Sequence, residues 1–212
     1  MKQRKKGNIQ RTILIAARVV SIVFTPFYLP LVGLMVLFYM SYLRLMPWEY
    51  KLQVLSLVFL FTVLMPSLLI RIYRHYHGWT LLELGVKERR MLPYVISIVC
   101  YFTCVYIMDQ LHIPHFMGSI VTAALLVQVL CALINVQWKI STHSAAIGGV
   151  AGAIVVFAFI FNFNPMWWFC LVLLLAGILG TSRMILRQHT LPQVVVGFFV
   201  GFFCSVAAIV FF

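Results

Sequence analysis

The chain has 212 residues, of which 64% are hydrophobic and only 9% are charged, whereas soluble domains carry about 25% charged residues. This composition excludes a soluble globular protein, because no soluble fold could cover so much apolar surface. The net charge of +12 does not indicate nucleic-acid binding, because Lys and Arg cluster at the N-terminus and in polar breaks between apolar runs. Only four residues are acidic, so a magnesium or two-metal site is not expected.

Residues 1–24 form a basic N-terminal segment. The part from about Asn8 to Phe24 is expected to be an interfacial or extended helix start. No small-residue cleavage site follows, so we interpret the segment as part of a retained first anchor and not as a signal peptide. Its basic side chains are Lys2, Arg4, Lys5, Lys6, Arg11 and Arg18.

Apolar runs of roughly 16 to 22 residues follow, close to the ~20 residues that cross a bilayer as a helix. They predict an all-α, polytopic transmembrane bundle with six or seven spans, in a multi-pass integral protein of the cell membrane. Residues 25–212 are expected to form a single membrane-embedded domain. The third and sixth runs are short, which is also compatible with tilted or re-entrant segments. The predicted spans are 25–44, 52–73, 93–108, 117–137, 144–161, 166–181 and 193–212.

Three polar breaks interrupt the apolar runs, at residues 71–93, 137–144 and 181–193. Two spans separate each break from the next, so all three are expected on one face of the membrane. Arg and Lys bind phosphate oxygens, and histidines serve as nucleophile and general acid in phosphoryl transfer. A single basic loop usually only sets topology. The joint pattern of Lys-x-Ser-x-His in one break and Ser-Arg-x5-His in another favours phosphoryl chemistry.

At these residues the chain resembles the type 2 phosphatidic acid phosphatase and haloperoxidase superfamily, whose motifs read K-x6-R-P, P-S-G-H and S-R-x5-H-x3-D. The third break matches best and has Gln193 where the family has Asp. The second break keeps the Ser and His, and the first keeps only the residue types. The resemblance covers about residues 87–205. The matching residues are Lys87, Arg89, Arg90 and Pro93, then Ser141 and His143, then Ser182, Arg183, His189 and Gln193.

The resemblance implies a membrane-embedded, phosphatase-like domain that hydrolyses a lipid phosphate or pyrophosphate without metal or cofactor, through a phosphohistidine. His189 would be the nucleophile, His143 the general acid and base, and Gln193 would accept the Nδ1–H of His189. The residues implied in phosphate binding are Arg183, Ser141, Lys139, Arg90 and Lys87. The expected partners are the bilayer and a lipid phosphate, with no nucleic acid.

Alternatives stay open for both function and substrate. The chain could be a weakened or inactive relative that binds lipid phosphate, or a transporter or scaffold. Substrate candidates are phosphatidic acid, phosphatidylglycerol phosphate, a polyprenyl pyrophosphate and a lipid A phosphate. The sequence also predicts a cytoplasmic active site, because seven crossings put the basic N-terminus on the same face as the breaks, whereas the opposite face keeps only Arg44 and Lys51.

Overall fold

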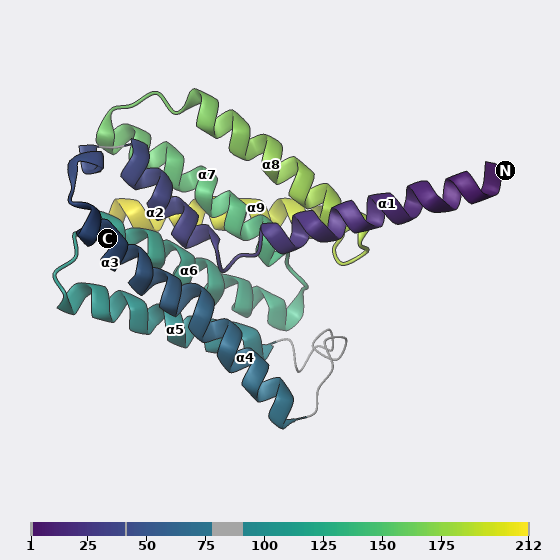
Figure 1. Ribbon diagram of the computed structural model, residues 1–212, viewed down its shortest axis with the longest axis horizontal. Helices are drawn as coiled ribbons and strands as arrows, with labels where there is room; N and C mark the ends of the chain where they lie inside the picture. The colour runs from purple at the N-terminus through teal and green to yellow at the C-terminus, as the bar shows by residue number, and fades with distance from the viewer. Residues whose placement is uncertain (1, 41, 78–90, 212) are drawn as a thin grey trace.

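The computed structural model describes residues 2–40, 42–77 and 91–211. Within these ranges every regular element is a helix (Figure 1), which confirms the predicted all-α bundle. The helices in chain order are α1 (Lys2–Val23), α2 (Leu29–Met40), η1 (Tyr42–Leu45), α3 (Trp48–Phe59), η2 (Leu60–Leu64), α4 (Met65–Tyr76), α5 (Met91–Gln110), α6 (His115–Gln137), α7 (Thr142–Phe161), α8 (Met166–Ile185) and α9 (Leu191–Phe211).

The helix within the first predicted span, residues 25–44, is shorter in the structure than expected. This helix, α2, has only 12 residues and is about 18 Å long, too short for a bilayer core of about 30 Å. Figure 1 shows α1 and α2 running one after the other in the same direction across the bundle. Pro26 lies between them and Pro30 lies in the first turn of α2. Because proline lacks an N–H donor and clashes with the preceding turn, it favours a break here.

The second span is a continuous helix of 29 residues, Trp48–Tyr76, made of α3, η2 and α4. Its middle part, η2, is π-helical. Pro66 follows two residues after the end of η2. A proline ring clashes with the carbonyl four residues before it, and the wider π turn relieves that crowding.

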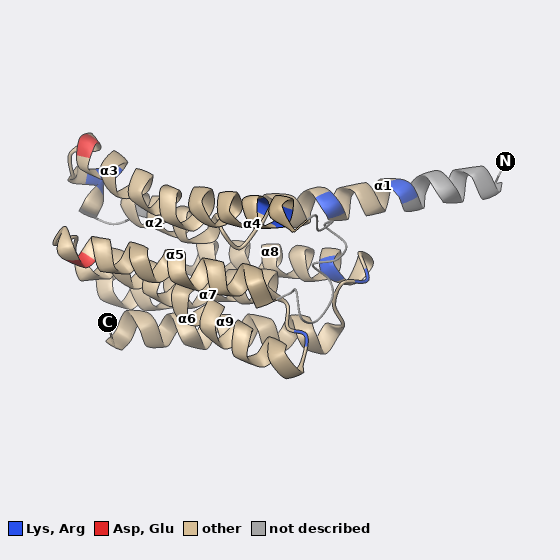
Figure 2. Cartoon of the chain, turned by 90° about the horizontal axis from the view of Figure 1, so that it is seen from below, with Lys and Arg blue, Asp and Glu red and all other residues tan. Residues whose placement is uncertain are grey.

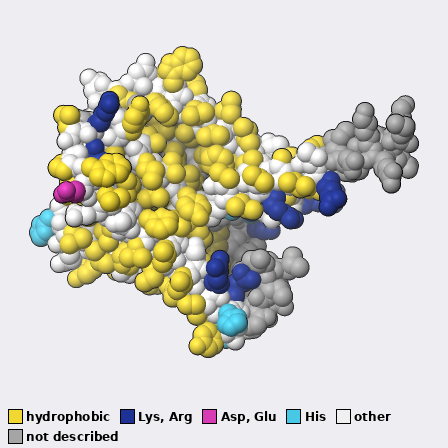
Figure 3. Space-filling view, in the orientation of Figure 1, with side chains coloured by type: hydrophobic (Ala, Val, Ile, Leu, Met, Phe, Trp, Pro, Cys, Tyr) yellow, Lys and Arg dark blue, Asp and Glu magenta, His cyan; other side chains and the backbone are white. Residues whose placement is uncertain are grey.

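Six helices in the described parts of the chain are long and apolar enough to cross a membrane: the Trp48–Tyr76 helix and each of α5 to α9. The third and sixth predicted spans, α5 and α8, have 20 residues each, or about 30 Å. Figure 3 shows hydrophobic side chains covering most of the visible surface between the two ends of the bundle. Such a surface suits lipid as the solvent.

The centre of the bundle is the pair α7 and α9, whose packing is the most extensive in the fold. Their backbones approach so closely that a Cβ on Gly148 would overlap the carbonyl of Phe198. A Cβ on Gly152 would lie 2.5 Å from the carbonyl oxygen of Phe202. Small residues permit such close approach between membrane helices. Around this pair, α6 packs against both helices, α8 against α7, α5 against α6, and α1 along α8.

One end of the bundle gathers most of the basic side chains that the structure describes. Figure 1 places the end of α4, the 138–141 loop and the 186–190 loop at this end, together with the start of α1. Figure 2 shows Lys and Arg concentrated there, whereas the described Asp and Glu residues lie at the other end. We call the first of these the basic end.

Candidate active site

The end of α8 explains the five-residue spacing between Arg183 and His189. Arg187 has a left-handed φ of 52°. The N–H of Gln188 donates to the Arg183 carbonyl at 3.1 Å, and the N–H of Arg187 to the Met184 carbonyl at 2.9 Å. These two bonds form a Schellman turn. The turn stops α8 and reverses the chain, and the side chains of Arg183 and His189 then line the same cavity.

His143 lies in the first turn of α7 and is close enough to Arg183 and His189 to interact electrostatically with both. Its Nδ1 is buried and has no hydrogen-bond partner in the described ranges. The Nε of Arg183 is buried and unpartnered in the same sense. Buried polar atoms are normally paired, so these two positions are suited to an acceptor supplied by a ligand.

Ser21 of α1 is a site residue that the sequence interpretation missed. Arg183 Nη1 donates a 2.7 Å hydrogen bond to Ser21 Oγ. The backbone of Ser21 also lies close to the His143 side chain. Ser21 reaches the site because the buried Ala17 and the half-buried Val20 hold α1 against the bundle beside α8. No local pattern marks it, since the contact joins residues 162 positions apart.

Ser141 and Gln193, both predicted site residues, act as helix caps in the structure. Ser141 is the N-cap of α7, and its buried Oγ accepts from the Ser144 N–H at 3.4 Å. Gln193 Oε1 accepts from the Thr190 N–H at 3.1 Å, as in the capping box of a helix start. The Ser141 N–H also donates to the Gln193 carbonyl at 3.3 Å, which ties the two breaks together. Orientation of His189 by Gln193 and phosphate binding by Ser141 stay predictions.

A polar cavity of about 230 Å³ lies at the basic end. Lys139, Arg183 and His189 line it from the second and third breaks. No carboxylate lines it among the described residues, so its charge is set by cations. Facing polar side chains come from α5 and α6, namely Tyr94, Ser97, Gln128 and Asn135.

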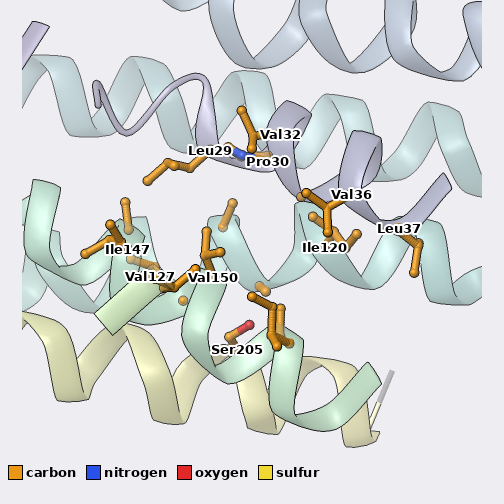
Figure 4. Close-up of a pocket in the computed structure, with 18 of the residues that line it drawn as sticks. Leu29, Pro30, Val32, Val36, Leu37, Ile120, Val127, Ile147, Val150 and Ser205 are labelled. Atoms are coloured by element: carbon orange, nitrogen blue, oxygen red, sulfur yellow. The ribbon is translucent and has the colours of Figure 1, made fainter. Parts of the chain in front are cut away.

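An apolar cavity of about 250 Å³ adjoins the polar one. It lies between α2 and the faces of α6, α7 and α8. Figure 4 shows Val36 of α2 near Ile120 of α6, with α7 side chains on another wall. The two cavities have three lining residues in common, Pro26, Gln128 and Thr142.

Lys87 and Arg90, the two predicted phosphate ligands of the first motif, lie outside the described residues. Asn135 and Gln128 are further polar residues of the cavity that the sequence interpretation missed. A signal for both was present, because uncharged polar side chains inside a long apolar run are unusual in a membrane helix and often functional. The described residues contain no group of three or more His, Cys, Asp or Glu side chains placed to hold a metal.

Comparison with protein families supports the resemblance. Residues 134–212 match the family model of the PAP2 superfamily, a superfamily of phosphatase type whose members generally hydrolyse phosphate esters. This match agrees with the resemblance drawn from the motifs over that part of the chain, and it contains His143, Arg183 and His189. No curated protein and no solved structure matches the chain.

Proposed function

We propose that the protein is a membrane phosphatase that hydrolyses a phosphate or pyrophosphate ester of a lipid. One observation carries the proposal: a cavity lined by Lys139, Arg183 and His189 adjoins an apolar cavity inside the bundle. A phosphate suits the first cavity because Arg and Lys bind its oxygens. A hydrocarbon chain suits the second.

Phosphate binding is assigned to the cations of the polar cavity. Arg183 binds two phosphoryl oxygens. Its buried Nε is one of the donors, and the phosphate gives this atom the hydrogen-bond partner that it lacks. Lys139 adds a second positive charge at the cavity wall. Phosphoryl transfer depends mainly on such positioning and charge stabilisation, so these side chains meet the main requirement without a metal.

Hydrolysis then proceeds in two displacements. A ring nitrogen of His189 attacks phosphorus, the bond to the lipid oxygen breaks, and His143 gives that oxygen its proton. In the second step His143 takes a proton from water, and the water oxygen attacks the phosphohistidine. The phosphorus–nitrogen bond breaks, inorganic phosphate leaves, and both histidines return to their starting states.

The direct test is phosphate release by the purified protein in detergent with EDTA present. The substrates are phosphatidic acid, phosphatidylglycerol phosphate, a lipid A phosphate and a polyprenyl pyrophosphate. Release from at least one of them in EDTA supports the proposal. Lipid phosphate binding without release would identify a non-catalytic relative instead. If the protein neither binds nor hydrolyses these lipids, the transporter or scaffold interpretation would remain.

Ser21 is expected to act as a positioning residue for Arg183. Ser21→Ala removes the acceptor of a charge-assisted hydrogen bond, which is worth about 1.5–3 kcal/mol. We expect kcat/KM to fall roughly tenfold or more and competitive inhibition by inorganic phosphate to weaken by a similar factor. Ser21→Thr keeps the hydroxyl and should restore both. A loss of thermal stability with unchanged phosphate inhibition would show that Ser21 only packs α1 against α8.

We further propose that the site faces the cytoplasm. The basic end carries Arg11 and Arg18 on α1 and Arg71 and Arg74 on α4. The other end carries Arg44 and Lys51, together with the acidic residues Glu49 and Asp109. An excess of Lys and Arg near span ends favours the cytoplasmic side.

Cysteine labelling tests this orientation. Thr190 is exposed in the loop before α9, and Glu49 is exposed at the opposite end of the bundle. In a cysteine-free background, Thr190→Cys should resist a membrane-impermeant maleimide in intact cells and react after lysis. Glu49→Cys, the control, should react in intact cells. The reverse pattern would place the active site outside the cytoplasm.

A further inference from the structure

Three polar side chains line the inside of the spans α5 and α6, where apolar residues are the rule. Asn135 and Gln128 lie two turns apart on α6, about 10 Å along its axis. Tyr101 lies on α5. Their side chains are 2%, 7% and 1% exposed, respectively. We call these three residues the polar strip. Within a bilayer such groups are costly, and they commonly line functional cavities.

The polar strip has hydrogen-bond donors that the protein leaves unused. Asn135 Nδ2 and Tyr101 Oη are buried and have no partner within the described part of the chain. Gln128 interacts with Tyr101 without completing a hydrogen bond. An unpaired buried donor is destabilising, so these atoms are suited to an acceptor from a ligand.

The polar strip connects the two cavities. Asn135 lines the polar cavity beside Arg183 and His189, and Tyr101 lines the apolar cavity. Gln128 lines both. The donors without partners therefore extend from Asn135, next to the expected phosphate position, to Tyr101, at the place expected for the hydrocarbon chain. A ligand that satisfies them has uncharged acceptors between its phosphate and its chains.

We propose that the polar strip binds the ester carbonyl oxygens of the substrate, and that the substrate is an acyl-ester lipid phosphate of the glycerolipid type. This inference rests on the proposed function. Amide N–H and phenol O–H groups donate to carbonyl oxygens. In a diacyl lipid phosphate, these oxygens lie between the phosphate and the chains. A polyprenyl phosphate has only hydrocarbon there and leaves the donors unpaired.

The test compares three substrates: a diacyl glycerol phosphate, its dialkyl ether analogue with chains of the same length, and a polyprenyl monophosphate. For the wild type we expect kcat/KM on the diacyl lipid to be at least about 10-fold higher than on the other two. Asn135→Leu keeps the approximate volume and removes the amide. It should lose about 10-fold on the diacyl lipid, about 1.4 kcal/mol, and change little on the other two.

Tyr101→Phe removes a single hydroxyl and should reduce the same preference for the diacyl lipid. It is the second test variant, to be used where Asn135→Leu does not fold. Ser119→Ala is the matched control, because Ser119 is also buried on α6 but lies near its other end, bonded to the Phe116 carbonyl. It should leave the substrate preference unchanged. Equal wild-type activity on all three substrates would overturn the polar-strip assignment while leaving the phosphatase intact. An equal loss on all three in Asn135→Leu would do the same.

A binding measurement separates the inference from the proposed function. If the wild type hydrolyses neither these three lipids nor any of the four substrates of the direct test above, the phosphatase proposal fails. Thermal stabilisation by the diacyl and dialkyl lipids then tests the polar strip alone. Stronger stabilisation by the diacyl lipid, lost in Tyr101→Phe, supports the inference. Equal stabilisation by both overturns it.

Discussion

His189→Ala is expected to abolish phosphate release, with kcat lower by at least about 10⁴-fold, as for other enzymes that lose their nucleophile. His189 is the single histidine that lines the described wall of the polar cavity. Without it, no phosphorus–nitrogen bond forms, and hydrolysis depends on direct attack by water. Colorimetric phosphate release from the preferred lipid measures the loss.

The two histidines should respond differently to the leaving group. His143→Ala removes the proton donor to the lipid oxygen, and p-nitrophenolate leaves without a proton. With p-nitrophenyl phosphate, His143→Ala should therefore recover part of the first step and accumulate an acid-labile, base-stable phosphoprotein. His189→Ala should form no such species. Phosphoprotein in His189→Ala would assign the nucleophile to another residue.

His115→Ala is the matched control, because it makes the same change on an exposed histidine at the other end of α6. It should keep wild-type activity. Size-exclusion profiles in detergent should be the same for wild type, His189→Ala and His115→Ala. A wild-type rate in His189→Ala would rule out the proposed mechanism.

The helical fold was predictable because lipid imposes a simple requirement on the sequence. Backbone groups in a bilayer must be paired internally, so long apolar runs become helices. The two prolines in the 25–44 run can be read from the sequence. The position of the short helix α2, however, depends on how it packs against α3, α6 and α7. Length alone therefore predicted a full span over residues 25–44, where the chain forms the 12-residue helix α2.

Only the site residues that lie in the sequence motifs were predictable. The spacing from Arg183 to His189 reflects a local turn, and local hydrogen bonds are encoded in nearby residues. Ser21 was not predictable, because it contacts Arg183 only after α1 packs along α8. Gln193 carried a capping signal, Thr-x-x-Gln, that competes with the role implied by the family.

Gly148→Ala is expected to destabilise the protein strongly, whereas Gly149→Ala at the next position is tolerated. A Cβ on Gly148 would overlap the Phe198 carbonyl of α9, a backbone atom that moves only with its helix. At Gly149 the nearest atom would be the Gly201 carbonyl oxygen at 3.7 Å, an ordinary contact. Both substitutions raise helix propensity by the same amount, about 1 kcal/mol, so the difference between the variants reports packing alone. We expect that difference to be about 3 kcal/mol or more in the free energy of unfolding.

The same overlap should also reduce activity in whatever Gly148→Ala protein folds. His143 lies in the first turn of α7, and His189 lies just before α9, so the contact between these helices sets the spacing of the two histidines. A displacement of about 1 Å between reacting groups costs about 10²-fold in rate. Activity per folded molecule should therefore fall about 100-fold in Gly148→Ala and stay near wild type in Gly149→Ala. Folded protein is quantified by size exclusion and by thermal unfolding of the same samples. If the two variants behaved alike, or if Gly149→Ala were the damaging one, the α7–α9 packing described above would be wrong, and the proposed spacing of the catalytic pair would lose its structural basis.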